Sequence, residues 1–157
     1  MSTADGTLVV GLGSPYGDDQ LGWRLVDEVR KRCPRPLAVY RARSALELFD
    51  WLGGVERLVI CDACQGAGPI GSWRCWHWPS ADLEPLRAQG SHDLALAAVL
   101  ALAETLGQLP RDVTIWAIEG LPAIGAGLPP DGSLSSEVEH AVPRVAALIS
   151  EELSRPR

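Results

Sequence analysis

The sequence lacks a basic excess, a long apolar run and a signal-peptide pattern. Its 157 residues carry 14 Lys and Arg against 20 Asp and Glu, which gives a formal net charge of −6. Because a surface that follows phosphates must be basic, we expect no nucleic-acid partner. The longest apolar run, residues 94–103, is too short to span a bilayer. Residues 1–6 are small and polar, so we expect a cytoplasmic chain without a membrane partner.

Cysteine patterns and common protease motifs are also scarce. Four cysteines without a secretory leader indicate free thiols in a reducing compartment and not a disulfide framework. Cys61 and Cys64 form one C-x-x-C, but no second pair follows at zinc-ribbon spacing. The chain has no Gly-x-Ser-x-Gly elbow and no His-Glu-x-x-His helix, which argues against the serine and zinc proteases that carry them.

The pattern of residues 8–24 predicts a strand, a glycine turn and the start of a helix. Residues 8–10 are an unbroken β-prone run, typical of a parallel strand that is covered on both faces. The glycines and the proline of residues 11–15 permit a sharp turn and prevent an immediate helix. Asp18 then fits the N-cap of a helix, with Asp19 in the first turn, where the helix dipole favours negative charge.

The rest of the chain alternates between strand and helix patterns. The order of these elements indicates one domain over residues 1–157, a three-layer α/β sandwich with a twisted, mostly parallel sheet between helices. After the opening strand, we expect a helix over 20–33, a strand over 37–40, a brief helix over 46–52, and strands over 57–62 and 72–78. A helix over 92–106, a strand over 112–118 and a closing helix from Ser136 complete the chain.

Local signals add detail to these elements. The alternation of residues 72–78 favours an antiparallel edge strand reached by a hairpin-like return. Ser91 is the expected cap of the 92–106 helix, and Ser136 with Glu139 forms a capping box for the last helix. Pro143 should kink that helix or split off its first turn. The Gly/Pro loop over 119–132 is long enough to be functional.

Three candidate ligands lie at element ends that share one edge of the expected sheet. Asp19 starts a helix, Asp62 ends a strand and His92 starts another helix. Two carboxylates and one imidazole make a mixed oxygen and nitrogen site that leaves positions open on a divalent cation. Each residue also has a plain structural interpretation: a helix cap, a strand-end turn and a solvated histidine. Cys64 could add a thiolate, whereas strand alternation directs Cys61 into the core.

The glycine turn permits a second interpretation, a dinucleotide-binding enzyme. Gly11-x-Gly13 after a strand begins like that fingerprint, and Arg41 and Arg43 could hold a ribose phosphate. Tyr16, however, occupies the place of the third glycine. The tryptophans of residues 73–78 also have two interpretations: they either pack an edge strand or form a surface for a protein partner.

Taken together, the motifs resemble the hydrogenase maturation proteases, the endopeptidases that trim the C-terminus of [NiFe]-hydrogenase large-subunit precursors. The matching pieces run over nearly the whole chain in the family's order. They are residues 11–22, residues 59–63 with Asp62, residues 68–71, residues 91–94 with His92, residues 113–119 and residues 134–138.

The resemblance implies a fold, a site and a partner. It implies a five-stranded sheet with one antiparallel strand, flanked by helices. The family's metal ligands match Asp19, Asp62 and His92, and counting back from Gly22 selects Asp19 rather than Asp18 as the first of them. The metal is nickel that the precursor supplies, and its recognition precedes release of the C-terminal peptide. We expect a monomer whose 119–132 loop and Trp-rich strand hold the precursor.

Two rival functions remain open at this point. A non-catalytic nickel-sensing chaperone of the precursor could use the same three ligands without cleaving anything. Peptidyl-tRNA hydrolase shares a similar opening motif, but it needs a histidine soon after the first turn and a basic face for RNA. This chain has no histidine before His77 and no basic excess.

Overall fold

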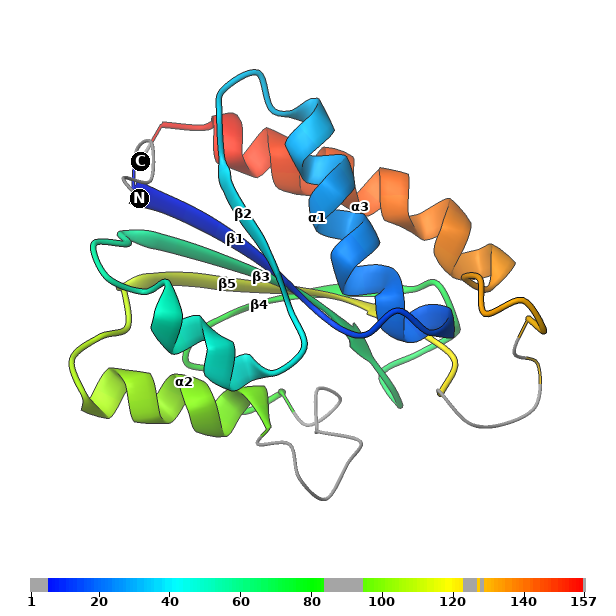
Figure 1. Cartoon of the computed structure of the whole chain (residues 1–157), viewed down its shortest axis with the longest axis horizontal. Helices are drawn as coiled ribbons and strands as arrows, with labels where there is room; N and C mark the ends of the chain where they lie inside the picture. Colours follow the sequence, from blue (N-terminus) through cyan, green and yellow to red (C-terminus); the bar gives the residue numbers. More distant parts are fainter. Residues whose placement is uncertain (1–5, 84–94, 123–126, 128, 157) are drawn as a thin grey trace.

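A computed structural model describes residues 6–83, 95–122, 127 and 129–156 (Figure 1). Five strands form one sheet in the order β2-β1-β3-β5-β4, in which only β4 is antiparallel to its neighbour. The strands are β1 (Thr7–Leu12), β2 (Ala38–Ala42), β3 (Arg57–Cys64), β4 (Trp73–His77) and β5 (Asp112–Glu119). The helices are α1 (Leu21–Arg32), α2 (Leu96–Thr105) and α3 (Ser136–Ser154), with short 3₁₀ turns η2 (Gly17–Gln20) and η3 (Ala45–Asp50).

Helices cover both faces of the sheet, so the expected three-layer sandwich is confirmed (Figure 1). Helices α1 and α3 pack together on one face, where Val9, Val59 and Ile118 point. Helix α2 and the η3 turn cover the other face, where Leu8, Ile60 and other alternate strand residues point. Burial on both faces explains why the central strands are almost entirely apolar.

Two expectations about the middle of the chain are wrong. Strand β4 does not form a hairpin with β3, because β5 lies between them and pairs with both. The expected helix over 92–106 is shorter than its pattern, since Ala95 has an extended backbone and α2 begins at Leu96. Ser91 and His92 lie outside the described residues. The antiparallel orientation of β4 at the edge of the sheet is confirmed.

The start of α3 also differs from the expectation. Ser135, not Ser136, occupies the N-cap position, and its hydroxyl makes no capping bond within the helix. The proposed box of Ser136 and Glu139 is therefore wrong. Pro143 lies inside a single continuous helix, so it does not split off the first turn. None of the described helices is both long enough and apolar enough to cross a membrane.

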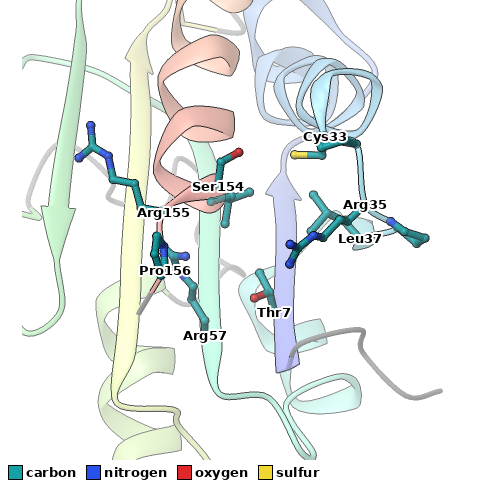
Figure 2. Close-up of a pocket in the computed structure, with 11 residues that line it drawn as sticks. Thr7, Cys33, Arg35, Leu37, Arg57, Ser154, Arg155 and Pro156 are labelled. Carbon is teal, nitrogen blue, oxygen red and sulfur yellow. The ribbon is translucent and has the colours of Figure 1, made fainter.

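A cavity of about 420 Å³ lies where β1 and β3 begin, at the end of the sheet opposite the predicted site (Figure 2). Arg57 lines it but is already neutralised, because its guanidinium lies 3.3 Å from Asp112 and 3.5 Å from Glu152. It also donates to the Glu152 main-chain carbonyl (3.4 Å) near the C-terminal end of α3. A cation at that end interacts favourably with the helix dipole. We interpret this arginine as a structural tie between the sheet and α3.

Candidate functional site

The carboxyl ends of β1 and β3 flank the point where the strand order of the sheet reverses. From β1 the chain passes through α1 to β2 on one side, and then returns to β3 on the other. Pairing between β1 and β3 ends at Gly11 and Cys61, whereas β3 continues beside β5 as far as Cys64. Open α/β sheets bind ligands at such a crevice. Asp62 is the first β3 residue beyond the shared pairing, and not the tip of the strand as expected.

Close packing at three glycines holds the first turn and α1 against this crevice. A methyl group on Gly22 would lie 2.1 Å from the Leu12 carbonyl oxygen and 2.7 Å from that of Cys61. One on Gly11 would lie 2.3 Å from the Gly22 carbonyl oxygen. One on Gly13 would lie 2.2 Å from the main-chain oxygen of Asp19. The glycines therefore serve close helix–strand contact, which puts the residue at position 19 beside the end of β1.

Asp62 and Asp19 interact electrostatically across the crevice. Burial raises the pKa of the Asp62 carboxyl well above its ordinary range, and the negative charge of Asp19 raises it further. The main-chain N–H of Ala63, which donates to Asp62 Oδ1 at 2.8 Å, opposes this rise. A bound cation would remove the repulsion between the two carboxylates, so both side chains fit a metal site in charge and in donor type.

Asp18 does not cap a helix, as the sequence suggested, but bonds to residues distant in the chain. Its carboxylate is 1% exposed and accepts three bonds from distant residues. The donors are the N–H of Leu121 (2.8 Å), the N–H of Ser135 (2.7 Å) and the hydroxyl of Ser135 (2.7 Å). Tyr16 occupies the N-cap position of η2 instead, without a side-chain bond. Asp18 thus ties the first turn to the segments that follow β5 and precede α3.

We expect Asp18→Ala to lower the free energy of unfolding by about 3 kcal/mol, because it leaves the half-buried N–H of Leu121 and the buried N–H and hydroxyl of Ser135 without partners. Urea denaturation measures the change. Asp131→Ala is the matched control, since exposed Asp131 accepts bonds only from nearby Ser133. Equal stability losses in the two variants would contradict the structural role of Asp18.

Glu119 is a buried carboxylate that was not among the candidate residues taken from the sequence. It is 4% exposed at the end of β5, and its oxygens accept the N–H groups of Gly66 (2.6 Å) and Ala67 (3.1 Å). The Cys64 thiol donates to the same carboxylate at 3.4 Å. Glu119 therefore fastens the loop after β3, whose first residues follow Asp62. The available signal was an acid at the end of a largely apolar strand.

The two cysteines of the C-x-x-C behave as buried thiols. Cys61 is fully buried in the core beneath α1 and α3, as strand alternation predicted. Burial, together with Glu119, raises the pKa of Cys64 to about 12. Without a bound metal ion, Cys64 is thus a protonated hydrogen-bond donor at neutral pH, and the alternative of a ligand thiolate stays a prediction.

The third predicted ligand, His92, lies outside the described residues, so its distance to Asp62 stays a prediction. The described part of the chain holds no group of three His, Cys, Asp or Glu side chains that could bind a metal ion. The structure therefore places Asp19 in the first turn and Asp62 on β3, where the charge of Asp19 raises the pKa of Asp62, and leaves the ligand set untested.

Comparison with solved structures agrees with this architecture. The hydrogenase maturating endopeptidase HybD from E. coli matches with a TM-score of 0.72 and 22% identity, over 94% of this chain and 91% of its own. The hydrogenase 2 maturation peptidase from a Thaumarchaeota archaeon matches with a TM-score of 0.62 and 27% identity, over 94% of this chain and 97% of its own. The chain has the fold of the hydrogenase maturation proteases. The resemblance noted in the sequence is confirmed.

A third match extends the comparison within hydrogenase maturation proteases. HycI from Thermococcus kodakarensis KOD1 has a TM-score of 0.67 and 21% identity, over 95% of this chain and 92% of its own. No protein-family model and no curated protein matches the sequence. The five-stranded sheet of this chain, with one antiparallel strand, confirms the expected fold class.

Proposed function

We propose that this chain is a processing endopeptidase that removes the C-terminal extension of a [NiFe]-hydrogenase large-subunit precursor after nickel insertion. Nickel arrives with the precursor, and Asp19, Asp62 and His92 recognise it. The cytoplasmic location and the monomeric state expected from the sequence belong to the same proposal.

The observation that carries this proposal is the carboxylate pair at the β1–β3 crevice. Asp19 and Asp62 come from different elements, yet the charge of one raises the pKa of the other. Repulsion between two carboxylates at a strand-order reversal destabilises the fold, and a positively charged ligand offsets that repulsion. Solved structures of this fold that are described as maturation proteases act on hydrogenases, according to their descriptions.

The chain's own residues would bind and orient the substrate. Asp19 and Asp62 supply oxygen ligands, and His92 supplies a nitrogen ligand. A divalent ion held in this way can polarise a peptide carbonyl and activate a water molecule. Cys64 makes a poor nucleophile, because its buried thiol stays protonated and donates to Glu119.

Purified chain should be mixed separately with nickel-loaded and nickel-free precursor, and both products should be weighed by mass spectrometry. We expect the loaded precursor to lose a C-terminal peptide at a rate at least about 100-fold above that of the nickel-free form. Equal cleavage of both forms would refute nickel-dependent recognition. Binding of the loaded precursor without any loss of mass would instead indicate the nickel-sensing chaperone.

A further inference from the structure

Strand β4 ends the sheet and leaves one row of main-chain groups facing outward. The N–H of Trp78 donates to the Val113 carbonyl, and the N–H of Glu119 donates to the Ser72 carbonyl. Residues facing each other in antiparallel strands alternate between bonded and non-bonded pairs. The even-numbered residues therefore bond to β5, and the N–H and C=O groups of Trp73, Cys75 and His77 point away from the sheet.

At the opposite edge of the sheet, a side chain bonds to an outward main-chain group of β2. There, Arg30 donates to the outward-facing Val39 carbonyl (2.9 Å), so an α1 side chain satisfies part of edge strand β2. Within the part of the chain that the structure describes, no side-chain bond reaches the outward main-chain groups of β4. An edge of this kind is a template for pairing with another strand.

A pocket of about 390 Å³ opens beside the first residue of β4. Trp73 forms one wall; it is 46% exposed and packs against Trp116 with ring centres 5.8 Å apart. The other wall is one face of the first half of α3. Apolar lining comes from Ile70, Trp73 and Ala141, and polar rim groups come from Glu137, His140 and Arg144. The volume admits one large side chain, whose apolar contacts would be Ile70, Trp73 and Ala141.

We infer that β4 binds an extended segment of the precursor as an added sixth strand, with one apolar side chain of that segment in the pocket beside Trp73. Main-chain bonds supply affinity in this mode of recognition, and pockets for alternate side chains supply selectivity. The inference rests on the proposed function for the identity of the partner, and on the β4 edge and its pocket for the manner of binding.

The geometry also sets which part of the precursor binds there. Trp73 pairs with Ile118, next to Glu119, so the pocket lies at the same end of the sheet as Asp62. A strand added outside β4 is three strand spacings from β3, about 14 Å. An extended chain crosses that distance in about four residues. The segment on β4 is therefore separated from the scissile bond by about four residues or more.

Amide hydrogen exchange on the wild-type chain, with and without an excess of nickel-loaded precursor, tests the inference. We expect exchange at the amides of Trp73, Cys75 and His77 to slow by about ten-fold or more. The amides of Arg74 and Trp76 are an internal control, because β5 already binds them. Unchanged exchange at the three outward amides would overturn the inference.

The exchange experiment tests the docking inference, and cleavage by the wild-type chain tests the proposed function, so the two can fail separately. Cleavage without protection of β4 would overturn the docking inference and keep the peptidase. Protection without cleavage would keep the docking strand and overturn the peptidase. Neither protection nor cleavage would overturn both.

Variants at Cys75 give a second measurement. Cys75→Pro removes an outward N–H without removing a bond to β5, and edge strands tolerate proline at such positions. Cys75→Ala removes the same thiol and keeps the N–H. We expect KM for the precursor to be about ten-fold higher in the proline variant than in the alanine variant, with kcat within about two-fold. Equal KM values in the two variants would contradict strand addition.

Discussion

Asp62→Asn is expected to reduce precursor cleavage by about a thousand-fold, equivalent to about 4 kcal/mol of transition-state stabilisation. The variant keeps an oxygen for the Ala63 N–H but loses the charge that would bind the cation. Because burial and Asp19 disfavour the ionised carboxylate, the same change should raise the melting temperature by about 3 °C. Loss of activity with a gain in stability distinguishes a functional residue from a structural one.

Cleavage assayed by mass spectrometry and thermal unfolding measure the two effects in one preparation. Asp50→Asn is the matched control, since Asp50 is an exposed acid at the end of η3, which packs on the face of the sheet opposite α1. It should change neither quantity. Normal cleavage by the Asp62 variant would remove the carboxylate pair from the proposed site.

Gly22→Ala should cost about 4 kcal/mol or more of the free energy of unfolding. The added methyl group would lie 2.1 Å from the Leu12 carbonyl oxygen, and backbone oxygens cannot move aside as a flexible side chain can. Relief requires α1 to shift away from β1 and β3, which also displaces Asp19 from Asp62. We therefore expect cleavage to fall even under conditions in which the variant remains folded.

Urea denaturation of Gly22→Ala and Gly53→Ala provides the comparison. A methyl group on Gly53 meets nothing within 4 Å, and its backbone has no positive φ, so stability should change by less than about 0.5 kcal/mol. A similar small change at Gly22 would show that the close approach of α1 to the sheet is not required.

The sequence predicted most elements because their patterns depend on local burial. Strands β1, β3 and β5 are buried on both faces, so each appears as a continuous apolar run. Helix α1 buries one face, and its fourfold spacing of apolar residues identified it within one residue at each end. The alternation in β4 likewise predicted an edge strand.

The predictions from the sequence are wrong where a residue far away in the chain bonds to, or pairs with, a residue that local rules assign to a neighbour. Ser135 caps no helix end with its side chain, because its hydroxyl donates to Asp18, 117 positions away. Local capping rules cannot anticipate that competition. Likewise, β4 pairs with β5, a strand that comes later in the chain, so no turn signal after β3 could predict its neighbour. The burial of Glu119 depends on a loop 52 positions away in the sequence.

By itself, the sequence determined the alternation of strands and helices, the glycine turn and the choice of Asp62 as a candidate acid. These features follow from side-chain periodicity and backbone freedom, which act within a few residues. Only the tertiary structure decided that Asp18 bonds to Leu121 and Ser135, and that β4 is the edge strand beside a pocket. Those distinctions depend on which groups meet across the sheet, and the pairing of distant strands and loops sets that.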